Sequence, residues 1–94
     1  METEQIQLDR IKSIIYGVYP FTEVDIKTNI NGNPDVIRIR VKYYLKGESY
    51  GVGEDYSRAI ANMRKDYTEY IVNKILSNIQ RDIITAYFVK NSCY

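Results

Sequence analysis

The sequence contains no histidine, no tryptophan and only one cysteine, Cys93. Without histidine, the chain lacks the commonest general base and the commonest metal ligand of proteins. A single cysteine excludes a disulfide within the chain and favours a reducing, cytoplasmic setting. We therefore expect a cytoplasmic protein that holds no metal and no other cofactor.

Long apolar runs and a strong net charge are missing as well. No stretch approaches the ~20 apolar residues that cross a bilayer, and no signal-peptide pattern opens the chain, so no membrane contact is expected. The 13 basic and 12 acidic residues give a formal net charge of +1. This balance argues against an acidic mimic of DNA and against a strongly basic nucleic-acid binder.

No set of residues typical of catalysis is present. The sequence has no serine–histidine–aspartate or cysteine–histidine set, no phosphate-binding loop of the GxxxxGK type and no metal-ligand spacing. A chain of 94 residues fits one domain. We expect a single non-enzymatic domain over 1–94, with a core at 3–72 and a C-terminal helical extension at 73–90.

The amino-acid composition also gives a hint of origin. Ten tyrosines, together with abundant isoleucine, asparagine and lysine, suggest an AT-rich genome. Small proteins of this composition are frequent in phages of low-GC bacteria. A phage-encoded protein that works in the bacterial cytosol is therefore one expectation.

The strongest local pattern is an alternation of apolar and mostly charged residues at 36–45. Its apolar positions are Ile37, Ile39, Val41, Tyr43 and Leu45. Lys46-Gly47 fits a two-residue hairpin turn, because glycine adopts a positive φ without steric cost. This turn leads into a short strand and places Tyr43 opposite Tyr50 on the apolar face.

A second alternation, at 22–30, predicts the first strand. Asn31-Gly32-Asn33-Pro34 is a dense turn signal that joins it to the strand at 36–45. The resulting hairpin places Asp25 opposite Arg40. Opposite charges on facing positions stabilise a strand pair by roughly 0.2–1 kcal/mol.

Three basic residues, Arg38, Arg40 and Lys42, share the polar face of the strand at 36–45. They could form a basic stripe for phosphate. They could equally belong to a solvated sheet face whose charge is neutralised by the neighbouring strand, and we favour this second interpretation.

Helical patterns flank the sheet. Apolar spacing predicts an amphipathic helix at 3–16, which Gly17 ends. After the sheet, one very long helix is expected from Asp55 to about residue 88, with Asp55 as its N-cap and Ser57 as the other candidate. No glycine or proline interrupts that stretch. Such a helix reaches past the short strands beside it.

The second half of this predicted helix is strongly apolar. A lone copy of the chain would expose that surface, which is unusual for a soluble protein. We favour self-association over the alternative, a break near Ser77-Asn78 that folds the end back. The expected contact residues of a homodimer through this helix are Ile75, Leu76, Ile79, Ile83 and Tyr87.

Together these elements predict an α+β domain of order αβββα. Its three-stranded antiparallel sheet is covered on one face by an N-terminal helix and a long C-terminal helix. The stretch 40–61 contains a strand, Lys46-Gly47, a Gly51-x-Gly53 pair and the start of the segment SRAIAN at 57–62. This order of elements and these residues resemble the double-stranded-RNA-binding domains.

In that family, the segment after the sheet is a serine followed by Lys-Lys-x-Ala-Lys, which grips phosphates across the major groove. Here Arg58 stands at the first lysine and Ala61 at the alanine, while Ala59 and Asn62 replace the other two lysines. The family's Gly-Pro-x-His loop is replaced by 31–35, which has no histidine. The resemblance implies the αβββα fold and contact with duplex nucleic acid through a degenerate motif.

The candidate nucleic-acid site follows from helical spacing. Arg58, Asn62 and Lys65 fall at i, i+4 and i+7, hence on one face of the predicted helix. In the first loop, Asn31 and Asn33 could reach a groove. The alternative, that these are ordinary solvated residues, stays open.

Two functions remain. The first is a degenerate double-stranded-RNA-binding-type module that contacts duplex nucleic acid. The alternative is a phage-encoded inhibitor or adaptor that binds a host protein, such as a defence or nucleic-acid enzyme, through a sheet edge and exposed tyrosines. The topology favours the first function, and the modest net charge favours the second.

Overall fold

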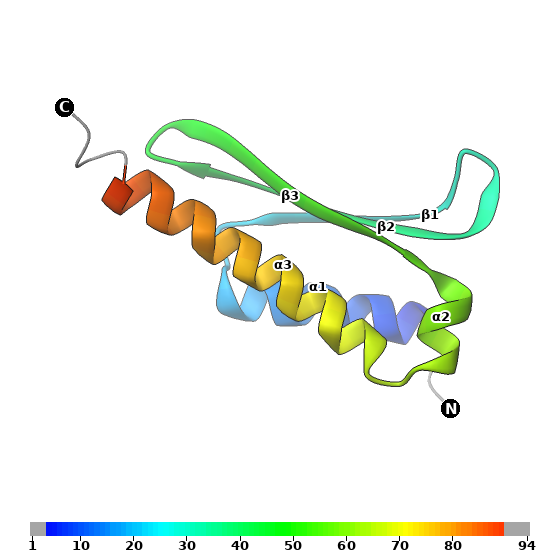
Figure 1. Cartoon of the computed structure of the whole chain (residues 1–94). Helices are drawn as coiled ribbons and strands as arrows, with labels where there is room; N and C mark the ends of the chain where they lie inside the picture. Colours follow the sequence, from blue (N-terminus) through cyan, green and yellow to red (C-terminus); the bar gives the residue numbers. More distant parts are fainter. Residues whose placement is uncertain (1–3, 90–94) are drawn as a thin grey trace.

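The computed structural model describes residues 4–89. In chain order, the elements are α1 (Glu4–Val18), β1 (Glu23–Ile30), β2 (Asn33–Leu45), β3 (Glu48–Ser57), α2 (Arg58–Met63), α3 (Tyr67–Ile84) and a π-helical turn η1 (Thr85–Val89). The two long helices, α1 and α3, lie side by side under one face of the sheet, and the opposite face is open (Figure 1). The predicted α+β architecture is confirmed.

The sheet has the order β1-β2-β3 and is antiparallel throughout. Tyr43 pairs with Tyr50 and Asp25 with Arg40, as the sequence predicts. Lys46 and Gly47 both have positive φ, 53° and 79°. This is the backbone of a two-residue turn whose twist matches that of the two strands it joins.

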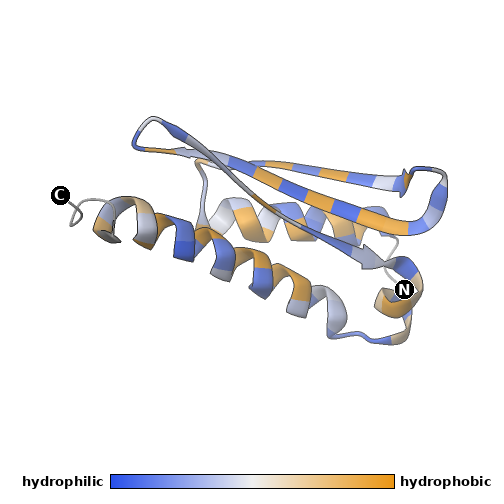
Figure 2. Ribbon diagram, turned by 45° about the horizontal axis from the view of Figure 1, so that its top comes forward, coloured by the Kyte–Doolittle hydropathy of each residue, from blue (hydrophilic) through white to orange (hydrophobic). Residues whose placement is uncertain are grey.

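The apolar face of β2 is the centre of the core. Figure 2 shows the alternation of hydrophobic and hydrophilic residues along this strand. The inward side chains of β2 are all at most 4% exposed, and they are Ile37, Ile39, Val41, Tyr43 and Leu45. Helix α1 packs against this face with Leu8, Ile11 and Ile15. Helix α3 packs against it with Ile71, Val72, Ile75 and Ile79.

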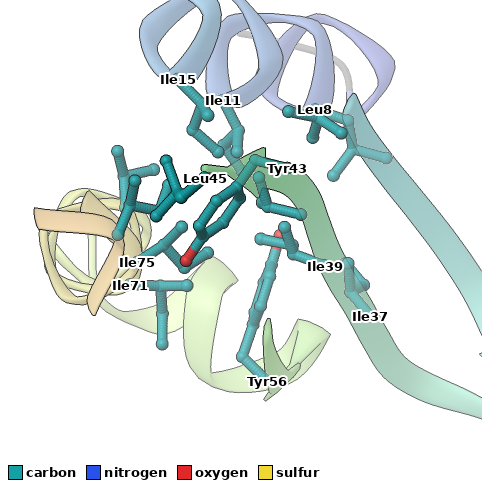
Figure 3. Packing of buried hydrophobic residues seen from close by; sticks show 14 of the residues in the cluster. Leu8, Ile11, Ile15, Ile37, Ile39, Tyr43, Leu45, Tyr56, Ile71 and Ile75 are labelled. Carbon is teal, nitrogen blue, oxygen red and sulfur yellow. The ribbon is translucent and has the colours of Figure 1, made fainter. Parts of the chain in front are cut away.

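Tyr43 joins the two helices to the sheet. It lies between Ile11 and Ile15 of α1 and the aliphatic residues of α3 (Figure 3). Tyr43 is 2% exposed, and its hydroxyl donates a hydrogen bond of 2.5 Å to Asp82 Oδ2. Burial is the main cause that raises the pKa of Tyr43, and the bond to Asp82 raises it further. The phenol therefore stays protonated and keeps β2 fixed to α3.

The expected helix from Asp55 to about residue 88 is wrong. Strand β3 continues to Ser57, and it is Ser57, the other candidate, that caps α2: its Oγ accepts a hydrogen bond of 3.3 Å from the Ile60 N–H. Helix α2 ends at Met63, and the chain turns at 64–66 before α3 begins. The break is thus not near Ser77-Asn78, which lies inside α3.

Burial explains this break. Tyr56 is only 6% exposed as a strand residue, and a helix that began at Asp55 would remove it from the core. Helix α2 starts at the end of the sheet, so a straight continuation would carry the apolar stripe of α3 away from β2. The turn at 64–66 brings that stripe back, and each large aliphatic side chain so buried is worth about 1.5–3 kcal/mol.

Two smaller expectations also change. Helix α1 runs through Gly17 to Val18, so Gly17 does not end it. The core includes Ile75, Ile79 and Ala86, so it continues into the segment 73–90 that the sequence indicated as an extension. Residue 3, residue 90 and Cys93 lie outside the described residues.

The burial of α3 predicts which of its isoleucines carry stability. Ile79→Ala should lower the free energy of unfolding by about 2–5 kcal/mol, because it removes a fully buried side chain and leaves a cavity. Ile84→Ala is the matched control on the same helix, where the side chain is 45% exposed, and it should change stability by under about 1 kcal/mol. Urea denaturation measures both. Equal losses for the two variants would contradict the position of α3.

Candidate binding surfaces

The predicted nucleic-acid residue Arg58 lies at the first turn of α2 and is engaged by the chain itself. It forms an ion pair with Glu4 at the start of α1, with one Nη2–Oε2 distance of 3.2 Å, and it donates to the carbonyl oxygen of Pro34 in β2. One guanidinium thus links the beginnings of three elements, which lie at one end of the molecule (Figure 1). A phosphate would have to compete with Glu4 for it.

The start of α2 also has an internal anion. The carboxylate of Asp35 accepts a hydrogen bond of 2.5 Å from Ser57 Oγ and one of 2.9 Å from the Ala59 N–H. The bond from Ser57 is the main cause that holds the pKa of Asp35 below its ordinary value, and the bond from Ala59 adds to it. The position where a helix would offer its N–H groups to a phosphate is therefore occupied by a side chain of β2.

The other predicted nucleic-acid residues do not share one surface. Asn62 lies on α2 near Arg58, but Lys65 lies in the turn after α2, because this helix ends at Met63. The expected common helical face of Arg58, Asn62 and Lys65 is therefore wrong. Lys65 instead lines a groove between α1 and α3.

A polar hollow does form beside Arg58. Its lining residues are Glu4, Gln7, Thr28, Asn29, Arg58 and Asn62. The loop residues that the sequence indicated, Asn31 and Asn33, are exposed at the end of the β1–β2 hairpin and do not line it. Asn33 instead accepts a hydrogen bond of 2.9 Å from the Asp35 N–H. The contribution of Thr28 and Asn29 was missed, because it depends on a shift in strand register after Thr28.

On the open face of the sheet, the two arginines of β2 are paired with β3. Arg38 binds both carboxylate oxygens of Asp55, at 3.1 to 3.3 Å. Arg40 Nη1 binds Asp55 Oδ1 at 3.0 Å and the carbonyl oxygen of Ile39 at 3.0 Å. The hydrogen bond from Arg38 is the main cause that lowers the pKa of Asp55. The neighbouring strand that neutralises the arginines is therefore β3. On β1, Asp25 faces Arg40 but has its ion pair with Lys27, at 3.8 Å.

Beside these arginines, two glycines leave the middle of the outer surface of β3 without side chains. Gly51 faces Lys42, and Gly53 faces Arg40. A hollow lies over this part of the sheet, lined by Arg40, Val41, Lys42, Gly51, Val52, Gly53, Glu54 and Asp55. The sequence pattern contains both glycines, but it does not show that they face two cations.

Along β3, successive residues point their backbone N–H and C=O groups alternately toward β2 and away from it. A two-residue turn makes Leu45 and Glu48 a hydrogen-bonded pair, so every second residue of β3 after Glu48 points its N–H and C=O groups toward β2. The residues between them, including Ser49, Gly51 and Gly53, point these groups away from the sheet. Within the described part of the chain, no side chain is bonded to those outward groups.

The opposite edge of the sheet is covered in part. On β1, the outward N–H of Val24 donates a hydrogen bond of 3.0 Å to the hydroxyl of Tyr16 on α1. The strand register also shifts near Asn29, which has a positive φ of 58°. The two edges of the sheet therefore differ: β1 is bonded to α1 at Val24 and irregular near Asn29, and β3 is regular and open.

The predicted dimer residues on α3 fall into two groups. Ile75 and Ile79 are fully buried within the chain itself and offer no surface to a second copy. Leu76 and Ile83 are partly buried against the core. Tyr87 is 42% exposed, and Lys46 Nζ lies 5.1 Å from the centre of its ring.

Two further observations concern metals and membranes. Within residues 4–89, no three acidic or cysteine side chains come together in a way that could hold a metal ion. In the same part of the chain, no helix is both long enough and apolar enough to span a membrane.

The comparisons with known proteins gave no match: no protein-family model, no curated protein and no solved structure matches this chain. The likeness to double-stranded-RNA-binding domains therefore consists of the αβββα topology that the structure shows.

The contact of Arg40 with Gly53 predicts a sharp difference between the two glycines. A Cβ at Gly53 would lie 2.6 Å from Arg40 Nη1 and 2.8 Å from the carbonyl oxygen of Ile39, whereas the nearest atom to a Cβ at Gly51 is 3.6 Å away. Gly53→Ala should lower the free energy of unfolding by about 1–3 kcal/mol, and Gly51→Ala should leave it within about 0.5 kcal/mol. Chemical denaturation measures both, and equal effects would show that Arg40 does not lie across Gly53.

The homodimer stays a prediction, and its surface is now the exposed end of the last helix. Ile84, Tyr87 and Phe88 are 45%, 42% and 68% exposed. Light scattering at micromolar concentration should give twice the chain mass of 11.0 kDa, and Phe88→Asp should return the mass to that of one chain. A wild-type mass of one chain would exclude this dimer.

Proposed function

We propose that this chain is a non-enzymatic protein-binding module, an adaptor or inhibitor, that receives an extended segment of its partner along the edge of β3. The observation that carries this proposal is the open backbone at Ser49, Gly51 and Gly53. A strand added there would complete hydrogen bonds that the chain does not make itself. Main-chain bonding of this kind is a common mode of peptide recognition.

The contrast between the two edges supports this choice. Natural proteins protect edge strands with proline, lysine, bulges or short length. Strand β1 has Lys27, a register shift and the Tyr16 hydroxyl. Strand β3 is 10 residues long, pairs regularly with β2 along its whole length and contains neither proline nor lysine, although Glu48, Glu54 and Asp55 place charges toward its two ends. The stretch between them, 49–53, carries no charged side chain and is suited to accept another strand.

The ion pairs of the arginines favour a protein over a nucleic acid. The affinity of a nucleic-acid site grows with the number of phosphates that its cations neutralise. Arg38 and Arg40 are paired with Asp55, and Arg58 is paired with Glu4. A phosphate would therefore have to share each of these arginines with a carboxylate of the chain itself.

Duplex nucleic acid is the second candidate, and one observation favours it. The polar hollow around Arg58 and Asn62 brings together α1, Thr28 and Asn29 near the end of β1, and α2. In the double-stranded-RNA-binding domains that this topology resembles, the first inter-strand loop and the start of the second helix contact the duplex. Such contact would require Arg58 to leave Glu4.

The test of the proposed function uses a variant that blocks the edge. Gly51→Pro replaces an outward N–H, so it removes a donor that β2 does not use, and proline is tolerated at such edge positions. Gly51→Ala is the matched control, because it keeps the N–H and fits the available space. Peptides selected from a random displayed library should bind the wild type and the alanine variant within about twofold.

The same peptides should bind Gly51→Pro about fivefold more weakly, because the outward N–H that donates one hydrogen bond of ~1 kcal/mol is lost. Fluorescence anisotropy measures the affinities, and circular dichroism confirms that the proline variant is folded. Undiminished binding to the proline variant would overturn the proposal. Low-salt binding of duplex RNA that Arg58→Glu abolishes would establish the second candidate instead.

A further inference from the structure

We infer that the segment received by β3 presents an acidic side chain opposite Gly51, and that Lys42 and Arg40 bind this carboxylate across the two glycines. This inference rests on the proposed function and adds the chemistry of the partner. Its basis is that the two cations of β2 lie beside Gly51 and Gly53, where β3 has no side chains between them and its open edge.

The register places the cations within reach of an added strand. Lys42 faces Gly51 and Arg40 faces Gly53 on the open face of the sheet. A strand added to β3 would lie two strand spacings from β2, about 9–10 Å. Any larger residue at 51 or 53 would place its side chain in that interval. With glycine at both positions, a long acidic side chain and a lysine can meet over β3.

The charges of the hollow favour an acid. Lys42 makes no ion pair within residues 4–89, although Glu23 faces it on β1. Arg40 uses only Nη1 for its bonds to Asp55 and to the Ile39 carbonyl, and its side chain is 43% exposed. The carboxylates of Glu54 and Asp55 also line the hollow, but Lys74 binds the first at 3.2 Å, and Arg38 and Arg40 bind the second. An ammonium group and the second Nη of a guanidinium are therefore available to a carboxylate.

A second copy of this chain is a poorer occupant. Strand β3 carries Glu48, Glu54 and Asp55 and has no basic residue. Antiparallel pairing of two β3 strands would bring these carboxylates toward one another, and like charges on facing positions destabilise a strand pair. Lys42 and Arg40 of one copy would also need a free carboxylate on the outer face of the other copy. Of the three, only Asp55 lies on that face, and two arginines already bind it.

The experiment continues from the peptides whose binding Gly51→Pro weakens. A glutamate scan along one such peptide locates the position that faces Gly51, and that position is then occupied by glutamate, glutamine or lysine. Each peptide is titrated by fluorescence anisotropy against the wild type, Lys42→Glu and Lys27→Glu. Lys27 is the control, since it lies on the same sheet face but on β1, away from the hollow.

Glutamate should bind the wild type about three- to tenfold more tightly than lysine does, and Lys42→Glu should reverse this order. Lys27→Glu should leave the order unchanged. Edge-bound peptides that show no preference for glutamate, or no reversal in Lys42→Glu, would overturn this inference while the proposed function stands. A library without any peptide that Gly51→Pro weakens would overturn both, and a dimer that Gly51→Pro dissociates would assign the edge to a second copy.

Discussion

The apolar face of β2 is the constraint on which the rest of the structure depends. This strand is the centre of a sheet of only three strands, so its inward side chains must be covered by helices alone. One helix is too narrow for that surface, and α1 and α3 therefore lie side by side beneath it (Figure 1). Tyr43 is buried between them, and its hydroxyl needs a partner there, which Asp82 of α3 supplies.

The polar end of the domain follows from the same arrangement. Because α3 must return under β2, the chain needs a short connecting helix after the sheet, and the start of this helix meets β2 and α1. Asp35, Arg58 and Glu4 satisfy the polar groups at that junction. In the structure, the residues that resemble a phosphate-binding motif in the sequence hold the sheet and the helices together at this junction. A nucleic acid would have to break these contacts before it could use them.

The sheet could be predicted from the sequence because its signals are local. Alternation and turn chemistry fix the pairing of Tyr43 with Tyr50, and a strand slipped by one residue would turn every core side chain outward. The break at 64–66 could not be predicted, since no glycine or proline marks it and the decision depends on where α3 finds a surface to cover.

The candidate sites show the same limit of local signals. The helical spacing of Arg58, Asn62 and Lys65 suggested one face, but the ion pair of Arg58 with Glu4 joins residues 54 positions apart. No local sequence pattern indicates such a contact. The position of Gly51 and Gly53 opposite Lys42 and Arg40 was hidden for the same reason, since it depends on the pairing of β3 with β2.

The hydroxyl of Tyr16 on the outward N–H of Val24 has a consequence for assembly. A sheet with two open edges can add strands from both sides, and repeated addition leads to fibres. Here one outward N–H of β1 is already bonded to a group from the chain's own first helix. A strand that added beside Val24 would have to displace the Tyr16 hydroxyl, and no such exchange is needed at Gly51 or Gly53 on β3. Stacking of one domain on the next through both edges of the sheet would therefore cost a hydrogen bond at every junction.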